Sequence, residues 1–71
     1  MTNWMQVFQE LKATDALFTV YLRYTQRDTL AKIPNVRVYE VHEDHVKLQN
    51  EGGIGILGYD DVLYISIPTK A

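Results

Sequence analysis

The sequence predicts a small, mainly β domain in which an N-terminal α-helix is followed by five short strands of a small barrel. Apolar residues in the first thirteen positions follow helical spacing, whereas later ones alternate with polar residues as in half-buried strands. All four glycines and one of the two prolines lie between residues 51 and 68, the stretch with the most continuous β pattern. Strand-like runs at close spacing, with polar turns between them, are typical of small barrels.

Length and composition limit what such a domain can be. Seventy-one residues form one domain at most, over 1–71, and a chain of this size buries only about 60% of its unfolded surface. There is no cysteine, so disulfides and cysteine–zinc sites are excluded. We therefore expect oligomerisation to supply the missing stability.

Charge and hydropathy exclude several function classes. No apolar run approaches ~18 residues, so we expect no membrane partner, and the N-terminus lacks the basic lead and apolar core of a signal peptide. Together with the absence of cysteine, this predicts a cytoplasmic protein. The net charge of −2 argues against a strongly basic nucleic-acid binder, although basic residues gather in the middle of the chain and acidic ones in its later half.

The chain is expected to begin with an amphipathic helix over about 3–13. Asn3 can cap this helix, and Gln6 occupies the capping-box position. Trp4, Phe8 and Leu11 follow helical spacing, so we expect them to face the body of the domain.

Alternating or β-branched runs predict five strands, at residues 16–24, 36–41, 45–49, 54–57 and 62–67. The segment 29–33 is either a loop or the start of a long, bent second strand, interrupted at Pro34–Asn35. Pro68 removes a ladder donor and should end the last strand. The two faces of that strand are expected to carry Leu63, Ile65 and Ile67 on one side and Val62, Tyr64 and Ser66 on the other.

Two segments of the later half carry a family resemblance. VRVYEVHEDHVKLQN, at 36–50, is a strand–turn–strand that ends in an apolar strand and an Asn. GILGYDDVLYISIP, at 55–68, consists of two short strands around a tight turn and finishes near a Pro. Both resemble the two motifs of the Sm-like (Hfq-like) family. The resemblance implies an N-terminal α-helix and a five-stranded, strongly bent Sm-like (SH3-like) barrel over about 16–68.

The resemblance also implies a function. Sm-like proteins are non-enzymatic, form homo-oligomeric rings, here expected to contain five to seven copies, and bind RNA through two turns that line the pore. The matching turn residues are His42, His45, Tyr59 and Asp60. The Arg that usually precedes Gly58 is missing, and Asp60 and Asp61 stand where the Hfq-like signature has basic residues, which weakens the implied RNA binding. Members of phage origin diverge in this way.

The family's rings form when the fourth strand of one copy pairs with the fifth strand of the next. Unpaired apolar edges at residues 54–57 and 62–67 would be a liability in an isolated barrel. We therefore expect an oligomer interface that contains Ile54, Ile56, Tyr64 and Ile65.

Aromatic and basic residues interleave in the middle of the chain. A surface that combines them can stack bases and hold phosphates, and the candidate RNA-binding residues are Tyr24, Arg27, Lys32 and Arg37. Contacts within the barrel or between subunits are the favoured interpretation of the tyrosines, because the net charge is negative.

Three patterns that resemble chemical sites are interpreted as turns. His42 and His45 are not expected to converge in a β turn, and no third metal ligand is identified. Asp60 and Asp61 should point apart into solvent, without the enclosed cleft that acid–base chemistry requires. The run 53–58 matches G-x-G-x-x-G but lacks the helix and the later acidic residue of a dinucleotide site. We expect no catalytic residue, no metal and no cofactor.

Other functions stay open. A homo-oligomeric scaffold or assembly module without nucleic-acid binding fits the same features. The segment 36–50 is also similar to carbon storage regulator proteins, which are RNA-binding swapped dimers, but the leading helix does not follow their plan.

Overall fold

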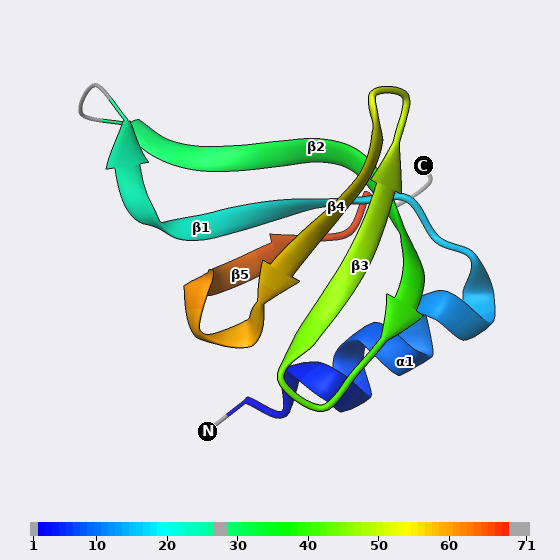
Figure 1. The fold of residues 1–71 in the computed structure, drawn as a ribbon. Helices are drawn as coiled ribbons and strands as arrows, with labels where there is room; N and C mark the ends of the chain where they lie inside the picture. Colours follow the sequence, from blue (N-terminus) through cyan, green and yellow to red (C-terminus); the bar gives the residue numbers. More distant parts are fainter. Residues whose placement is uncertain (1, 27–28, 69–71) are drawn as a thin grey trace.

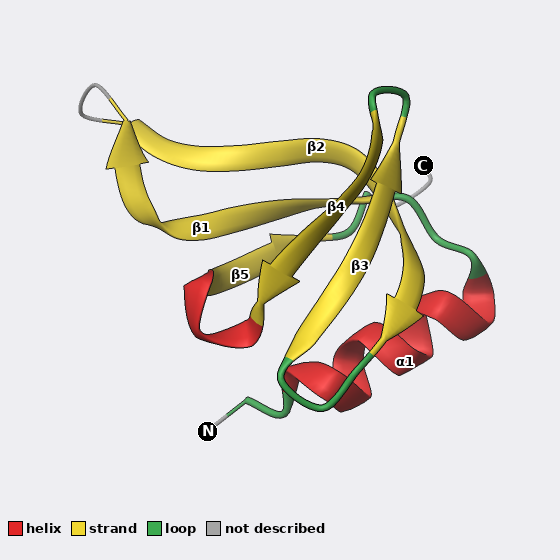
Figure 2. Ribbon diagram, viewed as in Figure 1, coloured by secondary structure: helices red, strands yellow, loops and turns green. Residues whose placement is uncertain are grey.

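A computed structural model describes residues 2–26 and 29–68 of the chain. This part of the chain contains an N-terminal helix and five strands that form one antiparallel sheet (Figures 1 and 2). The elements are α1 (Trp4–Thr14), β1 (Phe18–Gln26), β2 (Thr29–Val41), β3 (His45–Asn50), β4 (Gly53–Gly58) and β5 (Val62–Ser66). The predicted order of a helix followed by five strands is confirmed.

The helix begins and ends as its local sequence dictates. The side chain of Asn3 accepts a hydrogen bond from the backbone N–H of Gln6 at 3.1 Å, which satisfies one of the unpaired donors of the first turn. At the other end, Asp15 adopts a left-handed conformation with φ of 52°, and its N–H donates to the carbonyl of Lys12. The helix packs mainly against β2.

The strand β2 is long and bent, and it joins the two halves of the sheet. Its first part, to Val36, pairs with β1, whereas its last part, from Arg37, pairs with β3. The bend lies near Asn35, whose φ is 54°. The segment 29–33, which the sequence left as either a loop or a strand, is therefore the first part of β2. Because of the bend, β3 and β4 run across β1 and β5 in Figure 1.

The core lies between the two halves of the sheet and the buried face of α1. It is built from side chains that alternate inward along the strands, together with two helix residues. These are Phe8, Leu11, Phe18, Val20, Leu22, Val36, Val38, Val46, Leu48, Leu57 and Val62. Trp4 packs against this cluster and is half-buried, so the predicted inward face of the helix is confirmed.

The predicted faces of β5 are wrong. Val62 is fully buried and Ile65 packs partly against the core, whereas Leu63 and Tyr64 are exposed. Val62 pairs with Leu22 and Tyr64 with Tyr21, so the register shifts between these pairs and Leu63 is an extra residue. A β-bulge of this kind interrupts the alternation that the sequence pattern assumes.

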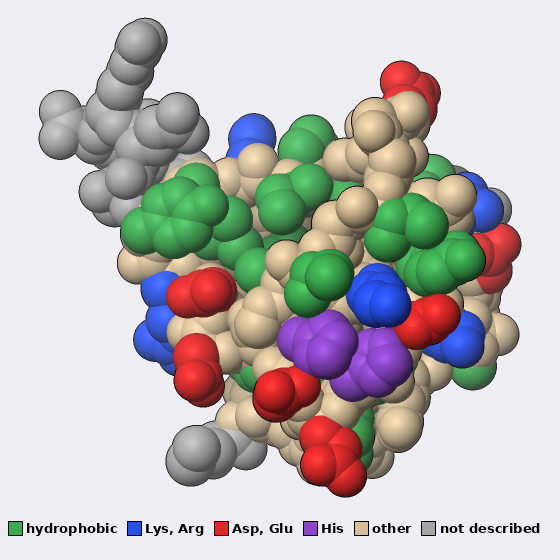
Figure 3. All heavy atoms as spheres, in the orientation of Figure 1, with side chains coloured by type: hydrophobic (Ala, Val, Ile, Leu, Met, Phe, Trp, Pro, Cys, Tyr) green, Lys and Arg blue, Asp and Glu red, His purple; other side chains and the backbone are tan. Residues whose placement is uncertain are grey.

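The sheet does not close into a barrel within the described residues. The strand order is β4-β3-β2-β1-β5, so β4 pairs only with β3, and β5 pairs only with β1. Figure 3 shows hydrophobic side chains on the surface above the two histidines in this view. In the part of the chain that the structure describes, no helix is long and apolar enough to cross a membrane.

Candidate functional site

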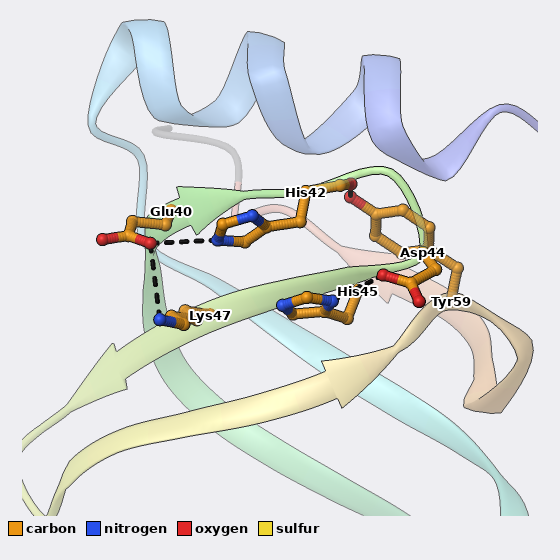
Figure 4. A network of polar contacts seen from close by, with 6 residues as sticks. All are labelled: Glu40, His42, Asp44, His45, Lys47 and Tyr59. Atoms are coloured by element: carbon orange, nitrogen blue, oxygen red, sulfur yellow. Dashed lines mark hydrogen bonds and ion pairs between the residues drawn. The ribbon is translucent and has the colours of Figure 1, made fainter.

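The two turns that carry His42, His45, Tyr59 and Asp60 meet at one end of the sheet (Figure 4). The backbone N–H of Tyr59 donates to the carbonyl of Asp44 at 3.2 Å. The Tyr59 hydroxyl donates to the carbonyl of His42 at 2.5 Å. The β2–β3 turn and the short 3₁₀ turn at Tyr59–Asp61 therefore form one connected structure, and Asp60 remains exposed beside it.

Tyr59 also connects these turns to the helix. Its ring stacks on Phe8 with centroids 5.9 Å apart and planes 13° apart. Burial raises the pKa of Tyr59 above its usual value of 10.0, so the hydroxyl stays protonated and keeps donating. One face of the ring and the hydroxyl proton are thus already used inside the protein.

The two histidines stack on each other, which contradicts the expectation that they do not converge. Their ring centroids are 4.4 Å apart and the ring planes differ by 14°. The backbone N–H of His42 donates to the carbonyl of His45 at 2.9 Å, across a turn of only two intervening residues. Counting that two-residue turn in the sequence would have placed the two side chains opposite each other.

Each imidazole bonds a carboxylate. Nε2 of His42 donates to Oε1 of Glu40 at 2.9 Å, and Nδ1 of His45 donates to Oδ1 of Asp44 at 2.6 Å. The hydrogen bond from His42, followed by the charge of Lys47, lowers the pKa of Glu40. The hydrogen bond from His45 is the largest cause that lowers the pKa of Asp44. Sequence reasoning missed the partners Glu40 and Lys47, whose side chains approach to 3.5 Å.

This polar cluster faces outward because of strand alternation. Val46 and Leu48 point into the core, so His45 and Lys47 lie on the opposite face. Figure 3 shows the histidines side by side, with acidic and basic side chains next to them. Among the described residues, no three His, Cys, Asp or Glu side chains lie together as a metal-binding group.

The candidate basic residues do not gather in one place. Tyr24 and Lys32 are exposed, on β1 and β2 respectively. Arg37 lies at the far part of β2, where Nη1 approaches Oδ2 of Asp15 at 3.3 Å. Lys32 pairs with Tyr21 of β1, whereas Arg37 pairs with Gln49 of β3, so the two basic residues lie in different halves of the sheet. Arg27 lies outside the described residues.

The predicted interface residues differ in exposure. Ile54 and Ile56 lie on the same face of β4 and are 51% and 71% exposed, which is a liability for large apolar side chains on an edge strand. Tyr64 on β5 is 45% exposed and stacks on Tyr21 of β1 at a centroid distance of 4.4 Å. Ile65, in contrast, packs partly against the protein's own core.

Comparison with known proteins found no matching family model, no matching curated protein and no matching solved structure. The Sm-like resemblance therefore stays a prediction from the sequence, and the function has to be argued from the geometry.

Proposed function

We propose that this chain is a non-enzymatic subunit of a homo-oligomeric ring of the Sm-like kind, with five to seven copies. In this proposal the free edge of β4 in one copy pairs with the free edge of β5 in the next. The observation that carries it is the strand order β4-β3-β2-β1-β5, which leaves these two strands at the outer edges of one antiparallel sheet.

Open edges supply the hydrogen-bonding groups for such an assembly. In an edge strand, every second residue turns its N–H and C=O away from the sheet. The two strands are similar in length, with six residues in β4 and five in β5. The edge of β4 can therefore pair with the edge of β5 along most of its length. Each copy would offer β4 to one neighbour and β5 to the other.

The side chains on these edges also favour pairing. Ile54, Ile56 and Tyr64 expose apolar surface on the outer face of the sheet. Residues on directly neighbouring strands that share a face pack against one another. Pairing β4 with β5 would bring the isoleucines beside Tyr64 of the next copy and remove this surface from water.

The test is self-association measured by gel filtration with light scattering. Replacing Ile56 with Asp should leave only single copies, because a charge would enter the paired edge. Leu17→Asp is the matched control, since Leu17 is also exposed and lies outside both edge strands. Equal association of the two variants would contradict the proposal.

RNA binding by this ring is a second candidate function, favoured by the exposure of Tyr24 and Lys32 on the paired strands β1 and β2. Aromatic stacking combined with a phosphate contact gives salt-dependent binding of single strands. Lys32→Glu should then weaken binding to oligo-U or oligo-A at least tenfold, whereas Lys12→Glu, on the exposed face of α1, should have little effect. Without measurable oligonucleotide binding, the ring would be an assembly module.

A further inference from the structure

Gly55 leaves an opening in the wall of the core. It pairs with Leu48, and directly opposite residues of an antiparallel pair share a face, so a side chain at 55 would point to the same side as the buried Leu48. A Cβ added at Gly55 would meet no heavy atom within 4 Å. Its φ does not lie in the left-handed region that favours glycine. Neither packing nor backbone conformation within one copy requires a glycine there.

The opening belongs to an apolar groove of about 480 Å³. The groove lies where the sheet fails to close, and it exposes parts of Leu22, Ile33 and Leu48 beside Gly55. Among the described residues that line the groove, Asp61 alone is charged. A glycine in an edge strand beside exposed core is a site where another chain can approach closely.

The segment 62–68 has the chemistry to fill this groove. It contains no charged residue, so burying it requires no desolvation of a charge. Ile67, just beyond β5, is half exposed and lies two positions after the inward-facing Ile65. By strand alternation, Ile67 points to the same inward side as Ile65. Unlike Ile65, it does not pack against the core of its own copy.

We propose that Gly55 forms a socket that receives Ile67 of a second copy. This inference rests on the edge pairing of the proposed function and specifies its inner contact. Inward-facing side chains of paired strands lie on one face, so the glycine of β4 and an isoleucine that follows β5 would meet on the core side. The absent side chain at 55 is then explained by a neighbour rather than by the chain itself.

A double-mutant cycle tests the socket. Gly55→Val should weaken self-association at least tenfold by filling the space, and Ile67→Ala should weaken it by removing the occupant. In the double variant the valine should occupy the space that Ile67 vacates. Self-association of the double variant should therefore be at most about threefold weaker than that of Ile67→Ala alone. Additive losses in the double variant would overturn the inference.

Two controls keep folding and assembly separate. In the single-copy variant Ile56→Asp, adding Gly55→Val should leave the melting temperature equal or higher, because valine favours a strand and a Cβ at position 55 meets no heavy atom within 4 Å. A lower melting temperature would show that Gly55 is needed within one copy and would overturn the socket. If the unmodified chain does not associate, the proposed ring fails; if it associates and Gly55→Val associates equally well, only the socket fails.

Discussion

The short 3₁₀ turn between β4 and β5 differs from the two strands that it joins in how fully its polar groups are bonded. In this turn, the backbone N–H and the hydroxyl of Tyr59 both donate hydrogen bonds to carbonyls of the β2–β3 turn, and the Tyr59 ring stacks on Phe8. Within residues 2–26 and 29–68, β4 and β5 each have one edge without a partner strand, and both strands expose large apolar side chains. The contacts at the turn stabilise one copy, whereas the strand edges are where the proposed pairing would place another copy.

The turns to which the family resemblance assigns RNA binding therefore have a structural role in this chain. The resemblance assigns the turns at His42, His45 and Tyr59 to base recognition, yet their polar groups bond one another and neighbouring carboxylates. Changes at the turn should therefore reduce stability and leave association intact. Changes at the edges should do the reverse.

The largest expected effect is on folding at the turn end. Phe8 is fully buried and contacts Trp4, Phe18 and Tyr59 through its ring. Phe8→Ala should cost about 3–5 kcal/mol, because it removes a large buried side chain and leaves a cavity. Thermal melting followed by circular dichroism would measure this, with Gln9→Ala on the exposed side of α1 as the control. A cooperative melt at the temperature of the unmodified chain would show that the Phe8 contacts contribute little to stability.

The second effect concerns protection of the edges. Amide hydrogens on the outer edges of β4 and β5 should exchange at least tenfold more slowly in the unmodified chain than in Ile56→Asp, because pairing with a second copy shields them. Amides of β3, which lies inside the sheet, serve as the internal reference. Hydrogen exchange followed by NMR separates the two groups. Edge amides that exchange equally fast in both proteins would argue that no pairing occurs.

A smaller effect is expected from the Tyr59 hydroxyl. Tyr59→Phe keeps the stack on Phe8 and removes the hydrogen bond to the carbonyl of His42. The loss should be about 1 kcal/mol, which lowers the melting temperature of so small a domain by roughly 4–8 °C. Association at saturating concentration should not change. Tyr24→Phe, at an exposed hydroxyl, is the control, and an equal loss there would remove the special role of Tyr59.

The smallest effect is the pH dependence of the carboxylate–histidine pairs. The folded-state pKa values of Glu40 and Asp44 lie below the usual values of 4.5 and 3.8. Their contribution to stability is therefore present above those usual values and is lost as the pH falls through the lowered ones. Urea unfolding between pH 7 and pH 3 should show a shallower acid loss in Glu40→Gln and Asp44→Asn than in Glu51→Gln. Identical slopes would count against both pairs.

Periodicity was sufficient to predict the helix, its Asn3 cap and the helix residues that join the core. These features depend on local spacing, and Phe8 and Leu11 are buried on the face that the spacing assigns. The faces of β5 could not be predicted in the same way, because the bulge at Leu63 is set by how the backbone pairs with β1. A single extra residue reverses which side chains reach the core.

The candidate site was predicted only in part. The turn residues were identified individually, but the stacking of His42 on His45 depends on the register of β2 and β3, which periodicity does not fix. The contact between Tyr59 and Phe8 joins residues 51 positions apart, and no local pattern indicates it. The openness of the sheet also follows from tertiary structure, because strand patterns do not say whether edges meet.

Whether the chain assembles into a ring can be decided from the mass of the unmodified chain in solution. Light scattering after gel filtration, at several micromolar concentrations, would give the number of copies in the particle. Edge pairing into a ring predicts one discrete mass of five to seven copies, each of 8.2 kDa. A single mass of 8.2 kDa at every concentration would contradict it, because both edges would then remain unpaired in the native protein.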